Sequence, residues 1–342
     1  MRVADGRSAA REWVTEHVAG QGDFRGAFFT GSAAAATDDE VLPPTSDVDV
    51  TVLLATDAAP PKLGKVCADG VLLDITFLPF DAVADADAVA GNYYLAPSFR
   101  HGQLIADPTG RLRAVQDRIA PRFAAPDEVW RRSEHVFGLM TSRLGALNTS
   151  LSWHELVMSW MFPTSLATQV VLVAARRAPT VRRRYLAAGA VLTALDHADY
   201  YATLLRQLGC ADCDPVTVQR HLDELAVVFD EAAAVARTPF FFSSDVTVEA
   251  RPISIDGSQD LIDSGDHREA VFWVVATFAR CLQILDADAP PRYQRADALF
   301  RHAVEELLGL VTPTELLARR DMVQVELPML RRTAAHLETA TE

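Results

Sequence analysis

The sequence predicts an α+β protein with a small β-sheet near its N-terminus and a mainly helical region after it. Two observations lead to this fold class. Short apolar segments separated by turn residues fill residues 1–110, as expected for the strands of a sheet. Beyond residue 125, apolar side chains recur at helical spacing over long stretches. A break in the pattern between Pro121 and Pro126 predicts two domains, 1–125 and 126–342.

The predicted elements of the first domain alternate between helix and strand. The helical spacing of Ala10, Trp13 and Val14 predicts an opening helix over residues 9–18. Asp69-Gly70 is a turn signal that joins two strands into a hairpin. The expected strands are 25–30, 48–55, 62–68, 71–79 and 103–106, with further helices over 81–89 and 109–122.

The second domain is predicted to consist of helices, because apolar residues repeat at intervals of three and four along it. The segment 239–255 is the exception and is expected to form a loop or a short hairpin, followed by a turn at residues 256–258. The expected helices are 127–147, 154–175, 181–208, 215–235, 268–285, 293–309 and 313–338.

Three aspartates in the first domain are candidates for a metal site. Asp47 and Asp49 are two residues apart at the start of a predicted strand, so their side chains point to the same face. Two adjacent carboxylates repel each other, and they are useful mainly when they share a cation such as Mg²⁺, which prefers hard oxygen ligands. Asp74 alone interrupts a later apolar strand and supplies a third carboxylate. The alternative is an edge strand with ordinary surface aspartates.

Gly31 and Ser32 form a candidate phosphate-binding turn. They follow directly after the first predicted strand, and a glycine lets the backbone approach an anion closely. A short helix over residues 33–36 would direct its N-terminus toward the same anion. The alternative is a simple strand-to-helix turn in which Ser32 is the N-cap.

The order of Gly31-Ser32, Asp47, Asp49 and Asp74 resembles the nucleotidyltransferase superfamily that includes DNA polymerase β and the antibiotic nucleotidyltransferases. The resemblance covers residues 1–110, and the remainder is similar to helical domains attached to bacterial nucleotidyltransferases. It implies a small mixed sheet with a helical domain closing over the active-site face. The loop 37–44 makes the spacer before Asp47 longer than is usual in the family.

The resemblance also implies a role for each candidate residue. Asp47 and Asp49 would bridge two Mg²⁺ ions, while Asp74 would hold the ion near the acceptor and take the acceptor's proton. Gly31 and Ser32 would bind the β- and γ-phosphates of a nucleoside triphosphate. The implied reaction transfers a nucleoside monophosphate, most plausibly AMP from ATP, to a hydroxyl of a small molecule and releases pyrophosphate.

The charge of the chain narrows the choice of acceptor. A net charge of −14 repels polyphosphate backbones, so nucleic acid is not expected as a partner and extension of a 3′ end is disfavoured. Two alternatives stay open: transfer to a protein side chain, and a non-catalytic nucleotide-binding regulator that keeps the fold. The sequence leaves the oligomeric state open.

The remaining features concern location and the helical domain. The polar N-terminus lacks a signal-peptide core, and four cysteines do not make a disulfide framework, so a cytoplasmic location is expected. No apolar run is predicted to cross a bilayer, and no membrane partner is expected. The pair Cys210 and Cys213 is only half of a zinc site. Arg182–Arg184 lie at the start of an expected helix, as either a solvated helix end or a triphosphate contact. Tyr185 is either a core residue or a base-stacking one.

Overall fold

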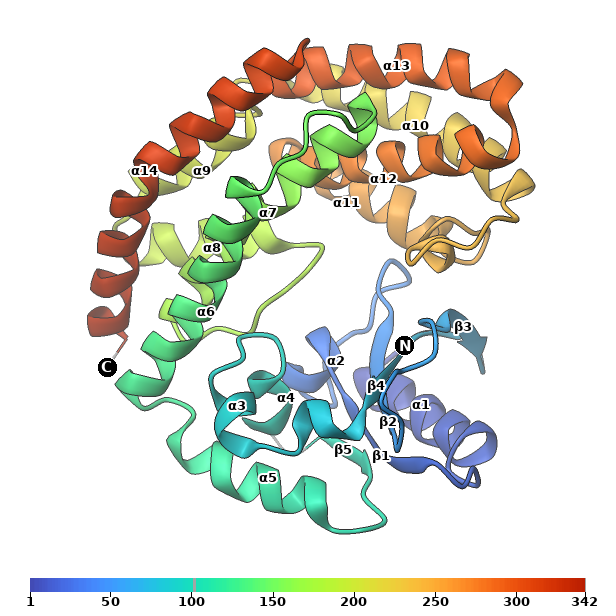
Figure 1. The fold of residues 1–342 in the computed structure, drawn as a ribbon, viewed down its shortest axis with the longest axis vertical. Helices are drawn as coiled ribbons and strands as arrows, with labels where there is room; N and C mark the ends of the chain where they lie inside the picture. Colours follow the sequence, from blue (N-terminus) through green and yellow to red (C-terminus); the bar gives the residue numbers. More distant parts are fainter. Residues whose placement is uncertain (101–102, 342) are drawn as a thin grey trace. The chain divides into compact units, whose positions relative to one another are not determined.

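The computed structural model describes residues 1–100 and 103–341, and the chain divides into two compact units. The first unit comprises Met1–His135 with Arg176–Val181, and the second comprises Val136–Ala175 with Arg182–Glu342. The sheet lies in the first unit, and the described part of the second unit contains helices and loops (Figure 1). The predicted α+β class is therefore confirmed.

The sheet of the first unit is mixed. Its order is β3-β4-β2-β1-β5, in which β2 and β4 are parallel and the other three pairs are antiparallel. Each strand expected from the sequence is present. The strands are β1 (Phe24–Phe29), β2 (Val48–Leu54), β3 (Gly64–Ala68), β4 (Val71–Pro79) and β5 (Leu104–Ala106).

Helices cover both faces of this sheet. Val48, Val50 and Val52 of β2 are buried with Trp13 of α1, whereas Leu53 belongs to a second core with the helices that follow the sheet. This alternation along β2 agrees with the strand period of two residues. The helices of the first unit are α1 (Val3–His17), α2 (Gly31–Ala35), α3 (Ala86–Ala90), α4 (Ala96–Arg100) and α5 (Arg111–Ile119), with 3₁₀ turns η1 (Phe80–Val83) and η2 (Ala120–Arg122).

Two expectations for the first unit need correction. The helix expected over residues 81–89 is divided into η1 and α3, because Asp85 interrupts it in an extended conformation and caps α3 by accepting from Asp87 N. The short helix α4 was not expected from the sequence, and it is too short to show a clear helical period.

The second unit is built on long helices. Helix α6 begins in the first unit and continues into the second. Helix α12 packs against α7, α10, α11 and α13. The elements are α6 (Pro126–Gly145), α7 (Trp153–Ala174), α8 (Arg184–Ala194), α9 (Ala198–Leu208), α10 (Pro215–Val235), η3 (Ser243–Asp245), η4 (Pro252–Asp256, a π-helix), α11 (Gly257–Asp263), α12 (His267–Asp288), α13 (Pro290–Leu308) and α14 (Pro313–Ala340).

Two expectations for the second unit were wrong. The helix expected over residues 181–208 is two helices, α8 and α9, because the chain turns at Asp196 with a left-handed φ of 60°. The turn expected at residues 256–258 is instead the start of α11 at Gly257. The segment 239–255 is a loop with the short helical turns η3 and η4, so the loop alternative holds there and the hairpin does not.

Helices α7 and α12 form the core of the second unit. Both match a membrane span in length and mean hydropathy, contrary to the expectation that no apolar run is long enough. However, 89% of the apolar 18-residue stretch of α7 and 83% of that of α12 are buried within the protein, as in the central helices of a folded core. Length and hydropathy alone are weak grounds for a span in such helices.

Candidate active site

The structure brings the three predicted carboxylates together at one end of β2. Parallel pairing of β2 with β4 places Asp49 directly beside Asp74. Asp47 lies immediately before β2, and carboxylate oxygens of the three residues are all within 4.8 Å of one another. The sequence spacing therefore identified a cluster that only the parallel register completes.

Gly31 lies against this cluster, and a residue with a side chain would displace the Asp49 carboxylate. Its φ of +57° is in the left-handed region, and Thr30 N donates to Asp49 O at 3.0 Å across the adjoining strands. A Cβ atom added to Gly31 would lie 2.0 Å from Asp49 Oδ2. Ser32 is exposed in the first turn of α2, and Thr30 stands at the N-cap, so the alternative role of Ser32 as N-cap is wrong.

The turn is fixed to the body of the unit by Arg7 of α1. Its buried guanidinium donates to Ala33 O at 2.6 Å and to Ala36 O at 2.8 Å, at the carbonyl end of α2. Arg7 also forms an ion pair with Asp38, in the loop that makes the spacer unusually long. The extra loop therefore packs beside α1 and helps to hold the phosphate-turn candidate in place.

Two lysines that were not predicted as site residues from the sequence form ion pairs with the carboxylates. Lys65 Nζ is 3.0 Å from Asp47 Oδ2 and 3.2 Å from Asp74 Oδ2, and only 3% of the Lys65 side chain is exposed. Lys62 Nζ is 2.8 Å from Asp74 Oδ2. The turn at Asp69-Gly70 was the available signal, because a two-residue turn places Lys65 opposite Asp74 in the hairpin.

The electrostatics of the cluster favour an additional cation. Burial, followed by the charges of Asp47 and Asp74, raises the pKa of Asp49 well above its usual range in spite of the two lysines. In addition, Asp74 Oδ1 is buried and has no hydrogen-bond partner among the described residues. A bound divalent cation would relieve both the repulsion at Asp49 and the unsatisfied oxygen of Asp74, so these residues fit Mg²⁺.

Tyr94 is a further residue of the site that the sequence did not reveal. Burial of its hydroxyl and the nearby charge of Asp49 raise its pKa, while a hydrogen bond with the Thr30 side chain acts in the opposite direction. Nevertheless 44% of the residue is exposed. Tyr94 thus presents an accessible aromatic surface near the carboxylates, of the kind on which a nucleobase stacks.

Arg184 and Tyr185, two candidates from the helical region, belong to the core of the second unit, whereas Arg183 is exposed. Arg184 is buried, donates to Ser165 Oγ at 2.6 Å and lies 4.5 Å from the Phe272 ring, so a solvated helix end is wrong for this residue. Tyr185 is also buried, as a core tyrosine. Cys210 and Cys213 belong to no cluster of metal-ligand side chains within the described residues.

Comparison with known proteins identifies no family for this chain. No protein-family model matches the chain, and no curated protein matches it.

Proposed function

We propose that this protein is a nucleotidyltransferase that moves AMP from ATP to a hydroxyl of a small molecule and releases pyrophosphate. The observation that carries the proposal is the close approach of Gly31 to the carboxylate cluster. Gly31 lies in a strand-to-helix turn where a Cβ would clash with Asp49. Asp49 in turn pairs with Asp74 and lies near Asp47. Three carboxylates within 4.8 Å of one another repel each other, which would only destabilise strands whose role is purely structural.

Each residue has a defined task in this proposal. Asp47, Asp49 and Asp74 would hold Mg²⁺, which when bound supplies the positive charge that stabilises the attacking and leaving oxygens of phosphoryl chemistry. Gly31 leaves room for the Asp49 carboxylate beside the turn, and the exposed Ser32 would donate its hydroxyl to a phosphate. Asp74 would accept the proton of the acceptor hydroxyl. Tyr94 would contribute the stacking surface for the base.

The net charge of −14 supports a small-molecule acceptor rather than nucleic acid. Transfer to a protein side chain is the related alternative, because the same carboxylates would serve it. The choice between these acceptors depends on what product forms.

A non-catalytic nucleotide-binding regulator is a second candidate, and one observation favours it. Lys62 and Lys65 already neutralise part of the carboxylate charge, as expected of a cluster that has no metal to hold. In the proposed enzyme the same ammonium groups must release the carboxylates when Mg²⁺ binds. Both candidates predict nucleotide binding, and only the enzyme predicts pyrophosphate release.

We expect Lys65→Met to bind Mg²⁺ on the order of tenfold more tightly than the wild-type protein, because it removes a positive charge that competes for Asp47 and Asp74. Calorimetric titration with Mg²⁺ measures this change. Lys62→Met is the matched control, since Lys62 contacts only Asp74 in the cluster and is more exposed, and its effect should be smaller. Weaker Mg²⁺ binding by Lys65→Met would contradict competition between the ammonium and the metal.

We expect Asp74→Asn to reduce turnover more than it weakens ATP binding, because the proposed proton acceptor is lost while Asp47 and Asp49 remain. Steady-state kinetics and calorimetry with a nonhydrolysable ATP analogue separate the two effects. Equal losses would assign Asp74 to holding the nucleotide's metal, and unchanged values in both assays would leave it a structural residue.

The proposed function is tested by incubating the protein with ATP, GTP, CTP or UTP, Mg²⁺ and a cell extract. Pyrophosphate release together with a nucleotidylated small molecule in the mass spectrum is the expected result. Asp57→Asn is the matched control for substitutions of the three clustered aspartates, because Asp57 is an exposed aspartate beyond the opposite end of β2. Nucleotide binding without pyrophosphate from any triphosphate would favour the regulator, and a labelled protein would favour the protein-modifying alternative.

A further inference from the structure

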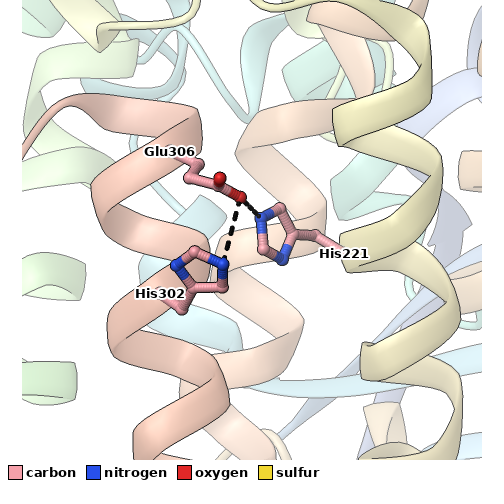
Figure 2. A group of neighbouring side chains, drawn as sticks. All are labelled: His221, His302 and Glu306. Carbon is pink, nitrogen blue, oxygen red and sulfur yellow. Dashed lines mark hydrogen bonds and ion pairs between the residues drawn. The ribbon is translucent and has the colours of Figure 1, made fainter.

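A second cluster of potential metal ligands lies in the helical unit, where α10 packs against α13. His302 and Glu306 are four residues apart on α13 and therefore share one face of that helix. Figure 2 shows these two side chains and His221 of α10 pointing toward one another. Glu306 Oε2 is 2.7 Å from His221 Nε2 and 3.4 Å from His302 Nε2.

The surroundings of His221 require a cation. Its imidazole is fully buried, and carboxylates face both ring nitrogens: Glu224 at 2.8 Å from Nδ1 and Glu306 at 2.7 Å from Nε2. A neutral imidazole has one N–H, so it can donate to only one of the two carboxylates. The second contact needs either an additional proton or a metal ion at that nitrogen.

The arrangement of Glu224 favours the metal. A histidine that binds a metal through one nitrogen usually donates its other N–H to a carboxylate, which fixes the tautomer and the ring orientation. Glu224 is positioned to accept from Nδ1, so that loss of the proton through which Nε2 contacts Glu306 would leave the Nε2 lone pair of His221 facing Glu306 and His302.

Arg220 supplies the positive charge that the cluster holds in this structure. Its guanidinium forms an ion pair with Glu306 and lies 3.2 Å from His302 Nε2, and 42% of its side chain is exposed. An exposed arginine can move into solvent when another cation takes its place.

We propose that His221, His302 and Glu306 form a Zn²⁺ site that ties α10 to α13. Two imidazoles and one carboxylate are a known donor set for Zn²⁺, and imidazole is a poor ligand for Mg²⁺. Donor atoms around tetrahedral Zn²⁺ lie about 3.3 Å apart, so His221 Nε2 and Glu306 Oε2 must separate by only about 0.6 Å. Because His302 and Glu306 are partly exposed, the fourth ligand position is open to solvent.

The proposal is tested by adding Zn²⁺, or Co²⁺ as a spectroscopic probe, to the protein in excess Mg²⁺. The excess Mg²⁺ occupies the carboxylates of the first unit, so that the assay reports on the histidine cluster. We expect one equivalent of Zn²⁺ to bind and to raise the melting temperature, and Co²⁺ to give the visible absorption bands of a tetrahedral complex.

Three variants distinguish this site from adventitious binding. His302→Ala should lose the Zn²⁺ and the Co²⁺ bands, whereas His336→Ala, which removes an exposed histidine of α14, should keep both. Arg220→Ala should bind Zn²⁺ on the order of tenfold more tightly, because the competing guanidinium is gone. Equal Zn²⁺ uptake by the wild-type protein and His302→Ala, or no uptake by the wild-type protein, would overturn the proposal.

Discussion

Asp49→Asn is expected to reduce nucleotidyl transfer by about 10³-fold or more and at the same time to make the metal-free protein more stable. The loss of activity follows because a neutral amide cannot replace an anionic metal ligand in the centre of the cluster. The gain in stability follows because burial and the neighbouring Asp47 and Asp74 raise the pKa of Asp49 in the folded protein.

The sign of the stability change depends on pH. Ionising Asp49 costs folding free energy once the pH exceeds the ordinary aspartate pKa of about 3.9, and the cost is complete above the raised pKa of the folded state. Asp49→Asn should therefore raise the melting temperature at neutral pH, by about 2–4 °C for each kcal/mol of relief, and should have little effect below pH ~4.

Calorimetry in the presence of a chelator and an assay of pyrophosphate release measure these two effects. Asp57→Asn should change neither. A variant of Asp49 with undiminished turnover would remove the carboxylates from the mechanism. A lower melting temperature at neutral pH would show that Asp49 stabilises the folded state through the nearby charges of Lys62 and Lys65.

Gly31→Ala is expected to abolish Mg²⁺-dependent binding of ATP. The added Cβ would lie 2.0 Å from Asp49 Oδ2, so the carboxylate must leave its place in the cluster. The left-handed backbone at φ +57° adds strain of roughly 1–2 kcal/mol for a residue with a side chain. Denaturant unfolding measures the strain, and calorimetry measures ATP binding.

Gly110→Ala is a control that separates the effect of backbone strain from that of the steric clash with Asp49. Gly110 has a similar φ of +72°, but a Cβ there meets no atom within 4 Å. Both variants should lose similar stability from strain, and only Gly31→Ala should lose ATP binding. If Gly110→Ala lost nucleotide binding to the same extent, general destabilisation rather than contact with Asp49 would account for the effect.

The sequence predicted the fold and the carboxylate cluster because both depend on local patterns. Alternating apolar residues predicted β2, and an apolar run interrupted only by Asp74 predicted β4. Their meeting depends on the parallel pairing of Asp49 with Asp74, which the spacing of residues does not contain. The family resemblance implied that the three aspartates share one site, but neither it nor the pattern predicted this pairing.

The parts that were missed depend on tertiary context. Lys65 follows a Pro-rich loop and is typical of a surface strand, yet it is buried on two carboxylates. Asp196 breaks the helix expected over residues 181–208 without glycine or proline to mark the turn. His221 and His302 lie on separate helices, and only the four-residue spacing of His302 and Glu306 was visible in the sequence.

The hairpin of β3 and β4 has a consequence for the order in which a newly made chain assembles its sheet. The turn at Asp69-Gly70 is local, so Lys65 and Asp74 come together early, before the more distant β2 can pair with β4. When β4 then docks on β2, Asp49 meets a partner whose negative charge is already offset by an ammonium group, and the repulsion between like charges on neighbouring strands is reduced. Lys65 thus neutralises Asp74 within the hairpin before β4 pairs with β2. The sheet can therefore form without a bound metal ion.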